Sequence, residues 1–455
     1  MLLHEALRLG VAPRLALVGA GGKTTALFLL GRELLAATSR PEPHIVFATA
    51  TTHLAVKQAR MADHHCTVLE PADVDACGAE LLAGLVLFTG VESGDGRVEG
   101  VSAASLERIR ALADSRNIPL LIEADGSRMK PVKAPAEHEP AIPPFVDMVV
   151  VVAGLSALGK PVAPEWVHRA DIFASLAGLA QGASITPEAL VSVLSHPQGG
   201  LKAIPDRARR LVLLNQADTP ELQSAAGSMA RRLLQYFEAV VVASLPPSSP
   251  VSSPVLAVYE PIVGVVLAAG GSSRFGQPKA LLSWRGEPFI RHVVNAALKA
   301  GLSPVVVVAG AHMPQICLAC AGLEVRLVHN PDWEEGQSAS LRAGLRALPS
   351  RVGAAVFLLA DQPQVPVGLI TALVEEHALS LAPIVAPLVD GQRGNPVLFD
   401  RRLFPGLMAL AGEMGGRALF SKYPITWVPW HDHRILLDVD TPDDYQALLD
   451  MDRET

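Results

Sequence analysis

The sequence has few cysteines and lacks long hydrophobic runs. Four cysteines among 455 residues are too few for a disulfide framework. One of the longest apolar runs, Met148–Leu158, falls well short of the roughly 18 residues that indicate a membrane span. The N-terminal residues also lack the basic region and long apolar core of a signal peptide. We therefore expect a cytoplasmic protein that has no membrane segment.

Positive charge is scarce as well. The chain has 38 Lys and Arg against 45 Asp and Glu, which gives a formal net charge of −7. Nucleic-acid binding depends on clustered Lys and Arg, so this balance argues against a nucleic-acid partner. Half of the residues are hydrophobic, which is enough to bury more than one core, and this length predicts two or three domains.

A segment rich in proline and serine divides the chain. Residues 244–261 read SLPPSSPVSSPVLAVYEP and show little periodicity, which is typical of a linker. We predict a first domain over residues 1–245, a linker over 246–261 and a second domain over 262–455. Both predicted domains are of ordinary size.

Both halves alternate short runs rich in Val and Leu with helix-like stretches. Examples of the runs are Leu15–Val18, Leu120–Ile122, Met148–Val152, Ile262–Leu267 and Ala355–Leu359. Such runs suit parallel strands that are covered on both faces. The sequence therefore predicts the α/β class, with two open, mostly parallel sheets that carry helices on both faces. Ligands of such sheets bind beyond the carboxyl ends of the strands.

A glycine-rich loop follows the first predicted strand of the second half, in the stretch VLAAGGSSRFGQPK at 266–279. Glycines allow the backbone to approach a polyphosphate closely. Arg274 and Lys279 supply positive charge where a leaving pyrophosphate would develop negative charge. The predicted nucleotide-binding residues at the strand end and in the loop are Leu267, Ala268, Ala269, Gly270 and Gly271.

Three later segments supply further candidates. Ser338 and Ser340 lie at a predicted helix start, where their hydroxyls can reach phosphate or ribose oxygens, although a plain N-cap is an equal alternative. Asp361 ends a buried strand and can hold Mg²⁺ against a triphosphate, or else cap a turn. Asp438 and Asp440 alternate on a predicted strand, and Asp440 would give the metal a second carboxylate.

The first half begins with its own glycine loop, RLALVGAGGKTT. It resembles the end of a phosphate-binding loop, in which Lys23 meets phosphate and Thr24 meets Mg²⁺. The usual spacing would place a glycine where Leu17 stands, so the loop is short for standard hydrolytic geometry. We still predict nucleotide binding over a structural turn, by Gly21, Gly22, Lys23, Thr24 and Thr25.

Two other strand ends of the first half carry polar residues. In LLIEADG, Asp125 would orient the metal or its water shell, and Glu123 would assist. In NQAD, Asn215 and Asp218 resemble the Asn-Lys-x-Asp element that reads guanine, with Gln216 in place of the lysine. A turn at a strand end explains Asn215 and Asp218 nearly as well.

The second half resembles the molybdenum cofactor cytidylyltransferases of the molybdopterin nucleotidyltransferase family. The motifs that carry this resemblance are LAAGGSSRFGQPK, NPDWEEGQSASL, LLADQP, GNPVLF and LLDVDTPDDY. The resemblance implies a nucleotide-diphospho-sugar-transferase-like fold and Mg²⁺-dependent transfer of CMP from CTP to the phosphate of molybdenum-bound molybdopterin. It further implies that Arg274 and Lys279 neutralise the triphosphate and that Asp361 and Asp440 hold Mg²⁺.

Three alternatives to this function remain open. The guanylyl branch of the family more often has a second glycine where Ala269 stands, so a methyl group there favours CTP without excluding GTP. The acceptor could be another phosphorylated alcohol. The chain could also be a non-catalytic cofactor chaperone for a molybdenum hydroxylase.

The first half resembles the selenium-dependent hydroxylase accessory protein family. The motifs that carry this resemblance are VGAGGKTT, TATTH, EADGSRMKPVKAP, HEPAIP and NQADT. It implies a P-loop-like, nucleotide-binding accessory role in the maturation of molybdenum hydroxylases. We therefore also expect a transient contact with such an enzyme.

Overall fold

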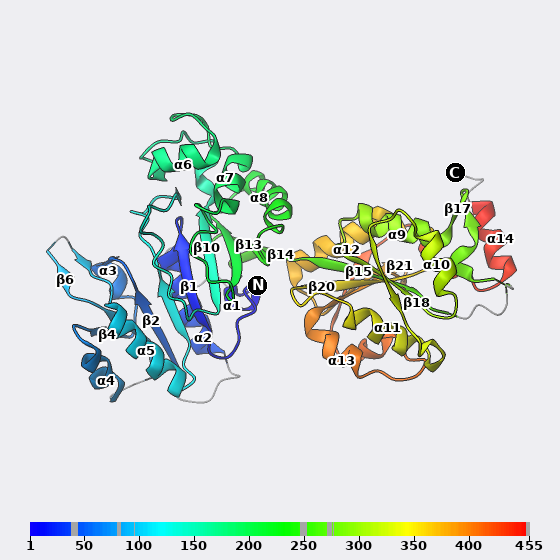
Figure 1. Cartoon of the computed structure of the whole chain (residues 1–455), viewed down its shortest axis with the longest axis horizontal. Helices are drawn as coiled ribbons and strands as arrows, with labels where there is room; N and C mark the ends of the chain where they lie inside the picture. Colours follow the sequence, from blue (N-terminus) through cyan, green and yellow to red (C-terminus); the bar gives the residue numbers. More distant parts are fainter. Residues whose placement is uncertain are drawn as a thin grey trace. The chain divides into compact units, whose positions relative to one another are not determined.

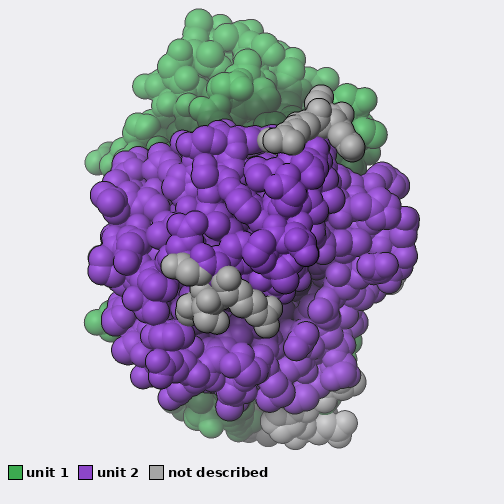
Figure 2. Space-filling model, turned by 90° about the vertical axis from the view of Figure 1, so that its right-hand side faces the viewer, with its two compact units in different colours: residues 1–259 green, residues 260–455 purple. Residues whose placement is uncertain are grey.

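The structure is a computed structural model that describes residues 1–37, 44–79, 83–94, 96–245, 253–270, 275 and 277–451. The chain divides into two compact units, Met1–Tyr259 and Glu260–Thr455 (Figure 2). Each unit is built around a largely parallel sheet with helices packed against it (Figure 1), which confirms the predicted α/β class. No helix in the described ranges is both long enough and apolar enough to cross a bilayer.

The sheet of the first unit has the strand order β14–β13–β12–β10–β1–β8–β2–β5–β4 among its described residues. Its strands are β1 Arg14–Gly19, β2 Ile45–Ala50, β4 His64–Thr67, β5 Gly84–Thr89, β8 Leu120–Glu123, β10 Met148–Gly154, β12 Arg209–Asn215, β13 Ala239–Ala243 and β14 Val255–Tyr259. All neighbours pair in parallel except β13 and β14. β10 is buried along its whole length and β1 at every residue but Gly19, which explains their continuous Val and Leu runs.

Helices and short strands complete the first unit. The helices are α1 Leu3–Ala6, α2 Lys23–Ala36, α3 Val56–Ala59, α4 Pro71–Ala79, α5 Ala103–Ser115, α6 Ala170–Ala177, α7 Pro187–Ser195 and α8 Pro220–Leu233. The short strands are β3 Leu54–Ala55, β6 Glu92–Ser93, β7 Arg97–Val98, β9 Val132–Lys133 and β11 Val167–His168.

One strand of the first unit lies in the predicted linker. β14 occupies residues 255–259 and pairs antiparallel with β13, so this part of 246–261 belongs to the first sheet. Backbone pairing at the sheet edge accounts for the difference, because Val255, Ala257 and Val258 are buried there. Residues 246–252 lie outside the described residues.

The second unit has the order β19–β18–β15–β20–β23–β21–β22 among its described residues, and β24 also pairs with β21. Its strands are β15 Ile262–Ala268, β16 Ser283–Trp284, β17 Glu287–Pro288, β18 Val305–Ala309, β19 Val325–His329, β20 Ala354–Leu359, β21 Ile384–Val389, β22 Gln392–Arg393, β23 Val397–Asp400 and β24 Ile425–Pro429. Its helices are α9 Phe289–Lys299, α10 Met313–Ala319, α11 Gln337–Arg346, α12 Val367–Ser380, α13 Phe404–Met408 and α14 Pro442–Met451.

Helices cover both faces of the second sheet (Figure 1) because side chains alternate along its strands. Along β15, Ile262 and Val266 join a core that includes residues of α9 and α12. Val263 and Val265 join another core with residues of α11 and α13. The parallel strands β15, β18 and β20 therefore end together at one open edge of the sheet.

Candidate functional site

A cavity of about 870 Å³ lies at this edge in the second unit. β15 and β20 are neighbours, so the segments that follow their last residues open into the same space. Eight of the residues predicted from the sequence line the cavity, namely Leu267, Ala268, Ala269, Gly270, Lys279, Ser340, Asp361 and Asp440. The structure thus gathers strand-end, loop and C-terminal residues that are far apart in the chain.

A lysine and two carboxylates form the charged centre of this cavity. The Lys279 Nζ donates a hydrogen bond to Asp440 Oδ1 and lies 3.9 Å from Asp361 Oδ2. The predicted meeting of a cation with two acidic side chains therefore occurs for these three residues. Arg274 and Gly271, which belong to the same prediction, lie outside the described residues.

Asp361 occupies an electrostatically unusual position. Burial raises the pKa of Asp361 to about 6, against the lowering effect of Lys279, and nearby Asp438 and Asp440 add to the rise. Burial also raises the pKa of Asp438, whose Oδ1 accepts a hydrogen bond from the Gln362 amide. The carboxyl groups of Asp361, Asp438 and Asp440 thus lie close together, and a bound cation would stabilise their ionised forms.

The residues present fit a divalent metal ion bound together with a phosphate group. Mg²⁺ in phosphoryl-transfer sites is commonly held by one or two carboxylates plus substrate oxygens rather than by a complete protein cage. Asp361 and Asp440 supply two hard oxygen donors. The described residues contain no group of three or more His, Cys, Asp or Glu placed to hold a metal by themselves, so phosphate oxygens would have to complete the coordination.

Two sequence predictions need correction in this unit. Ser338 is fully buried and does not line the cavity, because its place on α11 turns its hydroxyl toward Arg342, one helical turn later. Residues 437–440 do not form the predicted strand: a 3₁₀ turn at His433–Leu436 precedes them, and the Asp440 amide bonds to the Asp438 carbonyl. Asp440 nevertheless reaches the cavity, from a loop.

Several cavity residues were not predicted. Trp333, Gln337, Glu413 and Arg417 also line the cavity. The loop that carries Glu413 lies against the start of α11, where the Ser338 amide donates to the Gly412 carbonyl at 3.2 Å. Nothing in the local sequence signals this tertiary contact.

The first unit contains a separate cavity of about 950 Å³ at the carboxyl edge of its own sheet. All five predicted loop residues, Gly21, Gly22, Lys23, Thr24 and Thr25, line it. The amides of Ala20 and Gly21 already donate to the carbonyls of Val152 and Lys130, so the first part of the loop is tied to the protein. The cavity therefore lies at the N-terminus of α2, next to Gly22 and Lys23. The assignment of this loop as a P-loop stays a prediction.

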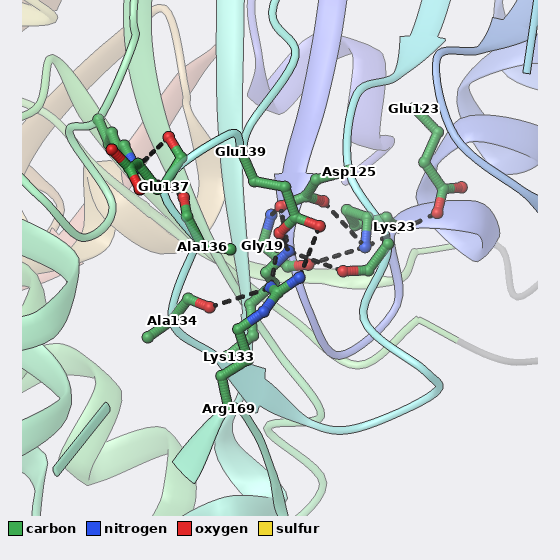
Figure 3. Close-up of polar contacts among 12 residues, drawn as sticks. Gly19, Lys23, Glu123, Asp125, Lys133, Ala134, Ala136, Glu137, Glu139 and Arg169 are labelled. Atoms are coloured by element: carbon green, nitrogen blue, oxygen red, sulfur yellow. Dashed lines mark hydrogen bonds and ion pairs between the residues drawn. The ribbon is translucent and has the colours of Figure 1, made fainter. Parts of the chain in front are cut away.

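Figure 3 shows how the charged residues behind this loop are paired. The Lys23 Nζ is buried, donates to the Gly19 carbonyl at 2.7 Å, and lies 3.2 Å from Asp125 and 3.7 Å from Glu123. Burial lowers the pKa of Lys23, but the two carboxylates raise it further, to a value above its ordinary one. Although the residue lines the cavity, the Lys23 ammonium is therefore held by two protein carboxylates.

The structure reverses the predicted roles of Asp125 and Glu123. Asp125 is 2% exposed and does not line the large cavity, because Lys23, Lys133 and the Gly19 amide surround its carboxylate. Glu123 does line the cavity and accepts a hydrogen bond from the Thr24 hydroxyl at 2.8 Å. Glu123 is thus the carboxylate placed to meet a ligand.

The predicted base-reading pair is also placed elsewhere. The buried Asn215 amide donates to the Gly21 carbonyl at 2.7 Å and accepts from the Leu245 amide at 2.9 Å. Asp218 is exposed and accepts from the Ser244 hydroxyl at 2.5 Å. Neither residue lines the cavity, whereas Gln216 does. Asn215 therefore braces the glycine loop from behind, and the geometry does not support base reading.

Comparison with known families assigns a different relationship to each unit. The family model of the YqeC protein matches residues 15–171, and that of the MobA-like NTP transferase domain matches residues 264–427. The uncharacterized protein YqeC of Escherichia coli (strain K12) is 35% identical over 223 residues, which cover 49% of this chain and 83% of that protein.

The relatives of the second unit carry different names. The nicotine blue oxidoreductase of Paenarthrobacter nicotinovorans is 32% identical over 199 residues, which cover 41% of this chain and 96% of that protein. A Bacillus cereus (strain Q1) protein named "Probable molybdenum cofactor guanylyltransferase" is 29% identical over 42% of this chain and 98% of its own.

A solved structure also matches the second unit. The crystal structure of Rv0371c from Mycobacterium tuberculosis H37Rv is 30% identical in sequence and covers 42% of this chain and 98% of that one, with a TM-score of 0.38. A complex of the same protein with manganese matches at 29% identity, with a TM-score of 0.38 over the same shares of the two chains.

Proposed function

Since the chain belongs to the YqeC family through its first unit and to the MobA-like NTP transferases through its second, we propose that the second unit transfers CMP from CTP to the phosphate of molybdenum-bound molybdopterin. Pyrophosphate leaves in this reaction. The observation that carries the proposal is the placement of Lys279 with Asp361 and Asp440, beside the glycine-containing strand end, in one cavity.

The chemistry follows from the charges in that cavity. The acceptor phosphate is already anionic, so no general base is needed, and positioning and charge stabilisation account for catalysis. Mg²⁺ held by Asp361 and Asp440 would neutralise phosphate oxygens. Lys279 then supports the charge that develops on the leaving pyrophosphate. Asp361 follows the buried strand β20 by two residues, which fixes the position of its backbone at the open edge of the sheet.

CTP is the proposed donor because of Ala269. This residue lies at the end of β15, is buried and lines the cavity, so its methyl group occupies space beside the bound nucleotide. A smaller space disfavours a purine base. The guanylyltransferase name of one relative makes GTP the direct competitor in any assay.

A pyrophosphate-release assay tests this proposal. The full chain is incubated with Mg²⁺, molybdenum-loaded molybdopterin and CTP, GTP, UTP or ATP, and products are identified by mass. We expect CTP to give the highest kcat/KM. Lys279→Ala should lower turnover by a factor of about 10² or more, the range found for loss of a transition-state charge contact, while the exposed control Lys422→Ala stays active. Preference for GTP would refute the donor assignment, and absence of transfer with every nucleotide would refute the reaction.

For the first unit we propose nucleotide binding in an accessory role during molybdenum hydroxylase maturation, with transient contact between this chain and the hydroxylase. The support is the cavity at the start of α2, where a large polar space meets a glycine loop and a helix N-terminus.

If Asp361→Ala abolished nucleotide transfer yet left hydroxylase maturation complete, a non-catalytic chaperone function of the whole chain would replace the enzymatic one.

A further inference from the structure

A strained turn lines the cavity of the first unit. Residues 126–130 lie between β8 and β9, and all five line the cavity of about 950 Å³. Arg128 and Met129 have φ values of +49° and +61°, although neither is glycine. Other residues rarely adopt this region of the backbone map, and those that do are concentrated at ligand-binding sites. The turn therefore holds two consecutive side chains at the cavity in an unusual conformation.

Backbone contacts hold this turn against the glycine loop. The Lys130 carbonyl accepts a hydrogen bond from the Gly21 amide at 3.1 Å, and the Lys130 amide donates to the Ser127 carbonyl at 3.0 Å. The Lys130 Nζ donates to an uncharged group, the Glu165 carbonyl, at 3.1 Å. The exposed Arg128 side chain makes no hydrogen bond or ion pair with any described residue. Within the described part of the chain, no carboxylate in direct contact neutralises either cation.

The buried ion pairs of this unit neutralise one another. They run in order through Glu123, Lys23, Asp125, Lys133, Glu139 and Arg169 (Figure 3). Three cations thus meet three carboxylates. Burial alone would raise the pKa of Glu139, but hydrogen bonds from Arg169 and Lys133 lower it to about 2, so this carboxylate stays ionised. The positive charges of Arg128 and Lys130 are therefore additional to a balanced network.

The two ends of this network reach the cavity at different places. Glu123 lines the cavity beside α2, where nucleotide binding is proposed. Glu139 and Arg169 line it at the other end of the chain of ion pairs. Asp125 and Lys133, which connect the two ends, are buried and do not line this cavity. The cavity therefore has a second charged region, separate from the end at α2.

His168 belongs to this second region. It precedes Arg169, lines the cavity, and has no hydrogen-bond partner for its imidazole among the described residues. Burial, together with the charges of Arg169 and Lys133, lowers the pKa of His168 to about 4. Arg128 contributes to the same shift, so its guanidinium lies near the imidazole. Near pH 7 the ring is neutral, and one of its nitrogens can donate a hydrogen bond to an anion.

We propose that Arg128, Lys130 and His168 bind the phosphoryl group of a second ligand, a phosphate monoester of a small organic molecule. Two additional positive charges match a group that carries nearly two negative charges at pH 7. Met129, which is 84% exposed between the two cations, supplies an apolar contact for the organic part. A volume of about 950 Å³ is near the upper end for small-ligand sites and leaves room for a nucleotide as well. The first unit is then a two-ligand site, which goes beyond the nucleotide binding proposed above.

Calorimetry with phenyl phosphate tests the second site in the full-length chain. Lys279→Ala and Asp361→Asn are introduced first, to weaken phosphate binding by the second unit. Phenyl phosphate is titrated into the chain alone and into the chain saturated with Mg²⁺ and ADP, GDP or CDP. We expect one phenyl phosphate to bind per chain in both cases. One-for-one displacement by the nucleotide would overturn the proposal, because the turn would then bind the phosphates of the nucleotide itself.

Matched variants identify the residues that bind the phosphoryl group. Arg128→Gln should weaken phenyl phosphate binding at least about tenfold, the effect of losing a hydrogen bond to a charged group. Arg128→Lys should restore part of the affinity, because it returns the charge without the paired N–H donors. Lys57→Gln is the control, since the exposed Lys57 lines the same cavity from α3. Equal losses in Arg128→Gln and Lys57→Gln would overturn the site in favour of a general charge effect.

The remaining results decide the kind of ligand and the link to the nucleotide. Inorganic phosphate should bind more weakly than phenyl phosphate, and Met129→Ser should remove that difference. Equal affinities in the parent chain would overturn the assignment to an organic ester. Unchanged phenyl phosphate binding in folded Arg128→Gln and His168→Phe chains, as judged by melting curves, would overturn the site. If no nucleoside diphosphate binds, the nucleotide proposal fails, while the Arg128→Gln result still decides the second site.

Discussion

Asp361 carries an electrostatic cost in the folded chain that its proposed role as a metal ligand would explain. Its pKa is raised to about 6, chiefly by burial, so the folded chain binds the proton more tightly than the unfolded chain does. The cost of keeping the carboxylate ionised is therefore absent well below the ordinary pKa of 3.8, grows between that pH and 6, and is complete above pH 7. We predict that Asp361→Asn, measured in EDTA, stabilises the second unit by about 1 kcal/mol at pH 8, or about 2–4 °C in Tm.

Thermal unfolding between pH 4 and pH 8 checks this prediction. The stability gain should shrink as the pH falls through 6 and be only a small fraction of its pH 8 value at pH 4, where the folded carboxyl is protonated. Asp332→Asn is the control, because Asp332 is exposed and its carboxylate stays hydrated. A variant that is less stable than the parent at pH 8, or whose gain does not change with pH, would contradict the assigned burial of Asp361.

At the residue scale, the sequence predicts the site residues that follow a strand end. It does not predict those whose position depends on the face of a helix or on packing between distant segments. Lys279 and Asp361 are predictable because a glycine loop and a buried strand place them at the open edge. Ser338 and Ser340 look equivalent in sequence, yet only Ser340 faces the cavity, since residues two apart on a helix point in different directions. Arg417 lines the site from a 3₁₀ turn at Gly416–Leu419, about 80 residues after Ser338, and no local pattern reveals this contact.

At the scale of elements, Asn215 connects the end of β12 to the loop between β1 and α2. Its amide makes two buried backbone contacts, to Gly21 and Leu245. Asn215→Ala leaves a buried carbonyl and a buried N–H without partners, at about 1–3 kcal/mol each. We predict that it lowers the unfolding free energy of the first unit by about 2–6 kcal/mol, measured by urea denaturation, and weakens nucleotide binding through the displaced loop.

Asp218→Ala is the matched variant at the other end of the NQAD motif, residues 215–218, and tests whether this motif reads a base. Asp218 is exposed and bonds only to Ser244 among the contacts seen for its side chain, so its loss should leave stability nearly unchanged. The relative affinity of the first unit for GTP and ATP should also stay the same. A selective loss of GTP binding in this variant would restore the base-reading interpretation of Asn215 and Asp218.

Strands that form continuous apolar runs are predictable from the sequence, whereas some strands of mixed composition are not. β1 and β10 were recognised because parallel strands covered on both faces become continuous apolar runs. β4, His64–Thr67, alternates between half-buried and exposed residues at the sheet edge, so it forms no continuous apolar run. β14 was hidden because proline and serine dominate the segment around it.

At the scale of the whole molecule, the boundary of the first unit follows from the pairing of β14. This strand covers the outer edge of β13, with Val241 opposite Val258 and Val242 opposite Ala257. The Tyr259 hydroxyl lies so close to Gly227 in α8 that a Cβ on that glycine would meet it at 2.9 Å. A first domain that ends at residue 245, as the sequence predicts, would lose all of these contacts.

We predict that a fragment of residues 1–259 unfolds in one cooperative transition, whereas a fragment of residues 1–245 melts at a markedly lower temperature. Val255 and Val258 are 4% and 1% exposed, and burying such side chains contributes about 1.5–3 kcal/mol each. The loss is therefore at least about 3 kcal/mol, which corresponds to about 6–12 °C for a unit of this size. The exposed edge of β13 should also promote association, measurable by light scattering.

Val258→Asp in the longer fragment should reproduce most of the loss of stability, because it places a charge at the same buried position. Equal melting temperatures for the two fragments would show that β14 contributes nothing to the first unit and that the unit ends before it.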